Sequence, residues 1–183
     1  MHWKMYKSIN SAKSGFLEEM NEAPTFWCLT INAHLESARV ALSRVYDQNK
    51  SAVSLRKMLQ HVCSNLDIMA YVDPFDPDFE RVSKERISRD IARCSGSDSL
   101  IKTLKIQRDK AIAHIASRPS EQAEVSENPL RYGMIEELLE RADDMFNFYS
   151  VRYDGMSHFV DLRESQHQDY ENVLVRAREG RLN

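Results

Sequence analysis

The sequence is poor in the residues that build turns and disulfide frameworks. Five glycines and five prolines in 183 residues are few, which argues against a fold rich in sheets and tight turns. The three cysteines, at positions 28, 63 and 94, are odd in number and widely spaced. They therefore match neither a disulfide framework nor a zinc-type cluster, and we expect reduced thiols of the kind that cytosolic proteins carry.

Long hydrophobic runs and a strong net charge are also missing. No apolar run approaches about 18 residues, and the amino end has no hydrophobic core of a signal peptide. We therefore expect a cytoplasmic protein with no membrane partner. The formal net charge is −3, from 25 Lys and Arg against 28 Asp and Glu, so the protein as a whole is not a polycation that coats nucleic acid. Any site for nucleic acid has to be local.

Helix-forming residues and helical periodicity recur throughout the chain. Leu, Ala, Glu, Lys and Arg are frequent, and apolar residues repeat at intervals of three and four. The expected helices cover residues 3–20, 25–45, 51–63, 83–93, 98–117, 130–153 and 162–182. The sequence thus predicts an all-α fold, an antiparallel bundle of four to five main helices with an appended C-terminal helix. We expect the bundle over residues 1–157, and the appendage, 158–183, packed on the bundle or on a second subunit.

The helix expected over residues 98–117 contains a residue that does not fit its pattern. Its apolar residues form one buried seam: Ile101, Leu104, Ala111 and Ile115. Arg108 lies on this seam. A guanidinium costs several kcal/mol to bury alone, so Arg108 needs a carboxylate, carbonyl or phosphate partner. His114 follows about 120° round the helix and roughly 9 Å along it, so both residues border one edge of the same face.

Positive charge is concentrated on this helix. From residue 99 on, the helix and the residue just after it contain one acid, Asp109. They contain five basic residues: Lys102, Lys105, Arg108, Lys110 and Arg118. Such a local excess in an acidic protein suits an anionic ligand.

The run from Arg108 to His114, RDKAIAH, resembles the signature of the HEPN superfamily of nucleotide-binding helical domains. That signature is an arginine, a short stretch that often begins with a polar residue, and a histidine on a late helix. The stretches 42–47, 54–55 and 132–139 are similar to the abortive-infection U branch of HEPN. Together these similarities cover roughly residues 20 to 155.

The resemblance implies metal-independent cleavage of RNA, in which the ribose 2′-hydroxyl attacks its own phosphate, with no cofactor. His114 would be the proton shuttle, since imidazole titrates near neutrality. Arg108 would hold phosphate oxygens with its planar fork. Asp109 would orient the imidazole or hold Arg108, or else be a solvent-facing partner of nearby lysines. The basic residues expected to bind phosphate are Lys105, Lys110 and Arg118.

Members of this superfamily that cleave RNA usually work as homodimers with both histidines facing one cleft, and the resemblance implies the same assembly here. It also implies an acidic residue of the second helix that reaches the site, and Glu36 or Asp47 could fill that role. Asp47 has a second interpretation as the start of a turn with Asn49. His34, on the same helix, is interpreted as a core histidine with a hydrogen-bonded ring rather than as a catalytic group.

Two other interpretations stay open besides a ribonuclease of the toxin–antitoxin or phage-defence type. The chain could be a non-catalytic binding or regulatory module that binds a nucleotide, RNA or a partner protein such as an antitoxin. It could also be a helical scaffold in which Arg108 forms an internal salt bridge. A metal site is not expected, because the acidic loop 73–78 lacks the glycine and final glutamate of a calcium loop.

Overall fold

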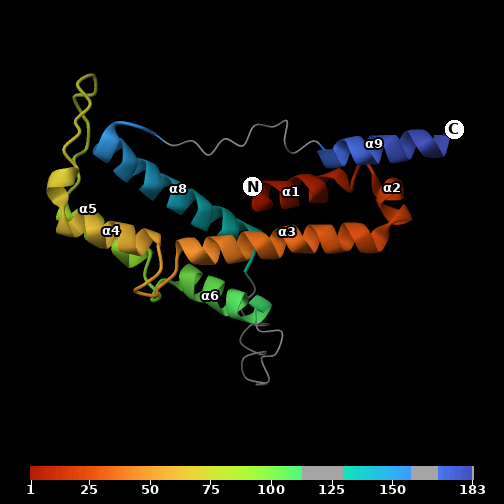
Figure 1. Cartoon of the computed structure of the whole chain (residues 1–183), viewed down its shortest axis with the longest axis horizontal. Coiled ribbons are helices and arrows are strands. Elements are labelled where there is room, and N and C mark those ends of the chain that lie inside the picture. Colours follow the sequence, from red (N-terminus) through yellow and green to blue (C-terminus); the bar gives the residue numbers. More distant parts are fainter. Residues whose placement is uncertain (113–129, 158–168, 183) are drawn as a thin grey trace. The chain divides into compact units, whose positions relative to one another are not determined.

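The computed structural model describes residues 1–112, 130–157 and 169–182, and over these ranges it is helical without a strand (Figure 1). The helices are α1 (His2–Ala12), α2 (Leu17–Glu22), α3 (Pro24–Val45), α4 (Leu55–Ser64), the 3-10 helix η1 (Leu66–Ile68), α5 (Lys84–Arg93), α6 (Ser99–Ile112), α8 (Tyr132–Asp154) and α9 (Asp169–Leu182). The predicted all-α class is confirmed. None of these helices is long and apolar enough to cross a membrane.

The chain divides into two compact units. The terminal unit comprises residues 1–38 and 160–183, and the central unit comprises residues 39–159. The division falls within α3, and α9 belongs to the same unit as the first two helices. The predicted domain boundaries, at 157 and 158, stay a prediction.

In the terminal unit, the N-terminal segment forms two helices rather than one. The buried residues of α1 are Trp3, Tyr6 and Ile9. The helix ends at Ala12, whose carbonyl accepts hydrogen bonds from the amides of Gly15 and Phe16. The continuous helix expected over 3–20 is therefore wrong, because a turn that includes a glycine interrupts it before α2.

The contact between α2 and α9 centres on Glu19, which is buried. Its Oε1 lies 2.9 Å from Nε of Arg178 and 2.8 Å from Nη2 of Arg181. Hydrogen bonding from Arg178, more than any other cause, lowers the pKa of Glu19 to about 2. The basic end of the last helix therefore has a structural role, because two arginines of α9 neutralise one acid of α2.

The central unit has an apolar core of its own. Its buried apolar residues are Leu42, Tyr46, Leu55, Leu59, Val62, Ile87, Cys94, Ile101, Leu104, Leu130, Ile135, Leu138, Met145 and Tyr149. Helix α4 packs on α5. The faces predicted for α4 and for the first half of α6 are confirmed, because these helices have one apolar stripe each and bury it.

Wide apolar stripes were less informative. In α8 the apolar residues Leu139 and Phe146 lie beside the buried stripe and are exposed, whereas Ile135 is buried. In α3 the apolar residues Leu29 and Ala33 are exposed and Val40 is half-buried. A period of three to four places residues on a helix face, but neighbouring helices decide how much of that face is covered.

Candidate functional site

The position of α6, which carries Arg108, depends on the buried side chain of Arg141 in α8. Its Nη1 donates to the carbonyl of Arg93 at 3.0 Å and to Oδ2 of Asp98 at 2.9 Å, and its Nη2 donates to Glu137 at 2.9 Å. Burial opposes the charge of Arg141, but the hydrogen bonds that it donates to Asp98 and Glu137, with their negative charges, prevail and raise its pKa. The two terminal nitrogens of the guanidinium are therefore paired, while its buried Nε has no acceptor among the described residues, and the group stays charged.

Asp98 links this network to the start of α6. Its Oδ1 accepts hydrogen bonds from the amides of Leu100 and Ile101, at 3.0 and 3.2 Å, which is the interaction of an N-cap. One carboxylate oxygen thus caps α6 while the other accepts from Arg141. Asp98 is therefore the N-cap of α6.

Arg108 lies at the edge of the core rather than inside it. Its side chain is 26% exposed, and it pairs with the adjacent Asp109, whose Oδ1 lies 2.8 Å from Nε and 2.5 Å from Nη2. Of the roles considered for Asp109, holding Arg108 is the one that these contacts form. The fully inward arginine of this unit is Arg141, which sequence reasoning missed although it lies on the seam of α8 between Leu138 and Met145.

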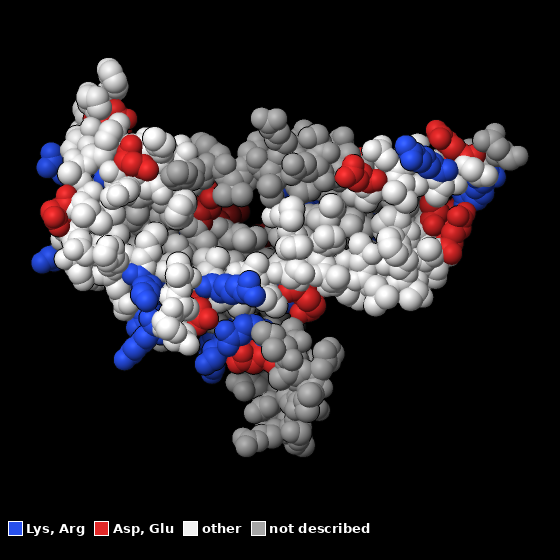
Figure 2. All heavy atoms as spheres, viewed as in Figure 1, with Lys and Arg blue, Asp and Glu red and all other residues white. Residues whose placement is uncertain are grey.

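Arg108 and Asp109 line an open cleft of about 750 Å³, which we call the α6 cleft. It is bounded by the end of α3, the loop that follows α3 and one side of α6. Its charged lining residues are Lys102, Lys105, Arg108, Asp47 and Asp109. Figure 2 shows Lys and Arg side chains gathered over the region of α4 and α6. The cleft therefore combines a basic wall with an acid on each side.

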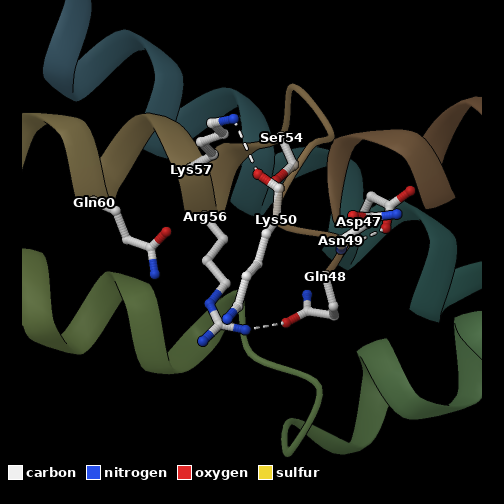
Figure 3. Close-up of a pocket in the computed structure, with 8 residues that line it drawn as sticks. All are labelled: Asp47, Gln48, Asn49, Lys50, Ser54, Arg56, Lys57 and Gln60. Carbon is white, nitrogen blue, oxygen red and sulfur yellow. Dashed lines mark hydrogen bonds between the residues drawn. The ribbon is translucent and has the colours of Figure 1, made fainter.

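A second cleft, of about 360 Å³, adjoins the first, and we call it the α4 cleft (Figure 3). Residues 47–49 line both clefts. The rest of its lining comes from the loop before α4 and from α4 itself: Lys50, Ser54, Arg56, Lys57 and Gln60. The two clefts thus meet at the segment that follows α3.

Gln48 organises the wall between the clefts. Its Nε2 donates to the carbonyls of Tyr46 and Cys94, at 2.7 and 2.8 Å. Its Oε1 accepts from Nη1 of Arg56 at 2.8 Å and from the amide of Gly96 at 3.1 Å. One side chain therefore joins the loop after α3, the loop before α6 and the first turn of α4. No local sequence signal identifies this residue, because its partners are distant in the chain.

The structure separates the two candidates for a supporting acid. Asp47 accepts a hydrogen bond from the amide of Asn49 at 2.9 Å, which confirms the turn interpretation, and it also lines the α6 cleft with Arg108. Glu36 belongs to the terminal unit. Asp47 is therefore the candidate that the geometry associates with Arg108.

Three predicted site residues cannot be placed. Lys110 belongs to α6, but its side chain, together with His114 and Arg118, lies outside the described residues. Within the described ranges, no group of three or more His, Cys, Asp or Glu could hold a metal ion.

His34 lies in the terminal unit, where its Nδ1 is 3.1 Å from Nδ1 of His2. Burial and, secondarily, the charge of His2 lower the pKa of His34. A half-buried histidine with a ring partner agrees with the structural interpretation of this residue.

Comparison with known proteins supports the resemblance that the motif suggested. No curated protein and no solved structure shows significant similarity to the chain. A family model described as AbiU2, within the HEPN group, matches residues 1–173. This match includes both units and the run from Arg108 to His114. Since it covers nearly the whole sequence, the chain belongs to the HEPN AbiU2 family.

Proposed function

We propose that the chain is a metal-independent endoribonuclease of a toxin or phage-defence type, with a composite site at the interface of a homodimer. The observation that carries this proposal is the α6 cleft, where Arg108 is held by Asp109 beside Lys102 and Lys105. A cleft with a fixed guanidinium and further cations suits a phosphodiester. The histidine needed for proton transfer, His114, follows on the same stretch of sequence.

The chemistry divides between Arg108 and His114. The ribose 2′-hydroxyl attacks the adjacent phosphorus and loses its proton to an imidazole, and the leaving 5′-oxygen gains a proton. Arg108 stabilises the charge that develops on the phosphate. Its Nε and Nη2 donate to Asp109, and this pairing fixes the plane of the guanidinium. The remaining nitrogen, Nη1, can then donate to a phosphate oxygen. Asp109 therefore positions Arg108. Its negative charge also offsets part of the positive potential of the guanidinium.

A dimer supplies what one chain lacks. The two proton transfers require a base and an acid, and a single chain provides one histidine of this motif. A two-fold axis beside the cleft would bring a second His114 to it. An antitoxin-like protein partner would then control access to the cleft.

The direct test is a cleavage assay on mixed RNA with purified wild type, His114→Ala and Arg108→Ala. We expect cleavage by wild type only, in the presence of EDTA, at sites that have a 2′-hydroxyl. The rate should fall on both sides of a neutral optimum as histidine becomes fully protonated or deprotonated. Activity that disappears in EDTA, or that persists in a folded His114→Ala dimer, would refute the proposed mechanism.

One observation favours a second candidate, a binding module without catalysis. Asp109 occupies two donors of Arg108 without any ligand, which is an arrangement that a purely structural ion pair also has. In that case wild type would bind RNA, a nucleotide or a protein partner at the cleft and leave RNA intact. The same assay, combined with RNA-binding measurements on wild type, separates the two candidates.

A further inference from the structure

The α4 cleft contains positive charge that the surrounding protein does not neutralise. Three basic side chains line it, Lys50, Arg56 and Lys57, against one acid, Asp47. Asp47 uses Oδ1 to accept from the backbone in the turn after α3. Lys57 donates to the carbonyl of Lys50 at 3.0 Å, which is a neutral partner. In Figure 3 the side chains of Lys50 and Arg56 extend to the same side of the cleft.

Arg56 is the most informative of these residues. Its side chain donates to the neutral amide of Gln48, and in the described part of the chain it forms no ion pair with a carboxylate. Its Nε is buried and has no hydrogen-bond acceptor there. A half-buried guanidinium is normally paired with a carboxylate or with several carbonyls. The accessible part of the half-buried Arg56 guanidinium therefore carries a charge that is available for an anion.

The first turn of α4 has a charge pattern that opposes the helix dipole. Acidic residues favour the N-terminus of a helix, where the dipole is positive, and basic residues are unfavourable there. The first turn of α4 contains no acid, and it contains both Arg56 and Lys57. The N-cap residue, Ser54, makes no side-chain capping hydrogen bond. An anion in the cleft would offset both features, since it would meet the cations and the unpaired amides together.

We propose that the α4 cleft is a phosphate subsite for single-stranded RNA that extends from the α6 cleft. Lys50 and Arg56 contact one backbone phosphate, and Lys57, which extends to the other side of the cleft (Figure 3), contacts a neighbouring phosphate. Residues 47–49 form the wall along which the strand passes between the clefts. The assignment of the ligand as RNA rests on the proposed function, whereas the site itself rests on the unneutralised cations. Two adjoining basic clefts favour a linear polyanion over a single small anion.

The composition of the subsite also predicts how it recognises RNA. Its lining contains no aromatic residue on which a base could stack. The donors that it offers are lysine ammonium groups, a guanidinium and the α4 amides, which suit phosphate oxygens rather than base edges. We therefore expect this subsite to increase affinity for RNA with little dependence on sequence.

The test is equilibrium binding of labelled single-stranded RNA on the order of a dozen nucleotides long, measured by fluorescence anisotropy in the His114→Ala background so that cleavage does not consume the probe. The subsite variant is Lys50→Glu with Lys57→Glu. The matched control is Lys84→Glu with Arg89→Glu on α5, because both of these residues are exposed, neither lines either cleft, and Lys84 also lies in a first helical turn. The two variants therefore change net charge equally.

We expect the subsite variant to bind RNA about tenfold more weakly. The slope of log K against the logarithm of the salt concentration should become smaller in magnitude by about 1.4, the value for two lost phosphate contacts with a single strand. The control should change affinity by less than about twofold. The melting temperature of the subsite variant should not fall, because Lys57→Glu places an acid in the first turn of α4. Weaker binding without loss of stability is the signature of a ligand site rather than a structural one.

Three results would overturn the inference. The subsite variant could keep wild-type affinity, or the control could lose as much as the subsite variant, which would indicate a general field effect. A labelled poly-glutamate peptide could bind as tightly as RNA and lose the same affinity in the subsite variant, which would assign the cleft to an acidic protein partner instead.

Failure of the subsite can be told apart from failure of the ribonuclease. If wild type does not cleave RNA but the subsite variant loses RNA binding, the phosphate subsite is supported and the proposed catalysis is refuted. If cleavage depends on His114 while the subsite variant binds normally, only the subsite falls.

Discussion

The terminal and central units differ in which partner of an arginine–carboxylate pair is buried. In the terminal unit the buried partner is an acid, Glu19, and the arginines that neutralise it are partly exposed. The central unit has a pair of the same kind, buried Asp90 with the more exposed Arg86, and also the reverse, in which Arg141 is buried and its acids are more exposed. In these pairs the charge of the buried group is compensated by groups of the same unit.

Among its described residues, the central unit also contains a half-buried arginine, Arg56, that forms no ion pair with a carboxylate. Arg56 pairs with an amide, whereas Arg141 pairs with two acids and a carbonyl. The comparison shows that the number of basic residues does not identify a binding site. The partners that each cation has in the folded chain distinguish a structural arginine from a binding one.

The largest effect should come from Arg141→Ala. This change leaves Asp98 without its buried partner and removes the link between α8 and the start of α6, so we expect about 3 to 5 kcal/mol lower stability. Denaturant unfolding followed by circular dichroism measures it, with Arg89→Ala as a surface control. A loss below about 1 kcal/mol would show that the network contributes no more than an exposed pair.

A smaller effect is expected from Gly155→Ala at the end of α8. Gly155 has a φ of 77°, and an added Cβ would lie 2.8 Å from the Tyr71 ring. We expect a loss of about 1 to 2 kcal/mol. Gly133→Ala in the same helix is the matched control, because a Cβ there meets nothing within 4 Å. That change should stabilise the protein by about 0.5 to 1 kcal/mol, and equal effects at the two positions would contradict the conformational argument.

The pH dependence of the terminal unit provides a third prediction. The pKa of Glu19 is lowered from 4.5 to about 2 in the folded state, so the stability from its ionised form is complete above about pH 4.5 and is lost as the pH falls toward 2. Glu19→Gln should lower stability at neutral pH and flatten this part of the acid-unfolding profile. If the slope between pH 4.5 and 2 is the same in the variant, other carboxylates account for it.

The smallest expected change in stability is that of Asp109→Asn, because the pair with Arg108 is largely exposed. We expect less than about 1 kcal/mol. Its effect on RNA should be larger, because an unpaired Arg108 loses orientation. Under the proposed function, cleavage falls while RNA affinity stays equal or rises. A parallel fall of cleavage and affinity would indicate that Asp109 supports binding rather than the position of Arg108.

The sequence predicts the structure well where a residue contacts groups that are close to it in the chain. Ser83 and Asp98 accept hydrogen bonds from the amides that follow them, and Gly155 ends α8 in the left-handed conformation. Each of these features depends on three or four consecutive residues, so local spacing predicts it. The same holds for the turn at Asp47 and for the buried face of α4.

The identity of the buried arginine was decided by the tertiary structure. Arg108 and Arg141 both lie on apolar seams in the sequence, and the prediction placed Arg108 inside. The partners of Arg141 include Asp98 and the carbonyl of Arg93, 43 and 48 residues away. No local pattern shows that these acceptors converge on α8, so periodicity alone could not choose between the two arginines.

By itself, the sequence determined the helical class, most helix ends and the motif from Arg108 to His114, because these follow from periodicity, caps and residue order. Only the tertiary structure decided that Gln48 joins three segments and that two basic clefts meet at residues 47–49. The physical reason is that burial and charge compensation depend on groups brought together from distant parts of the chain. Two lysines or arginines with the same local sequence can therefore have different roles, according to the carboxylates that the fold places beside them.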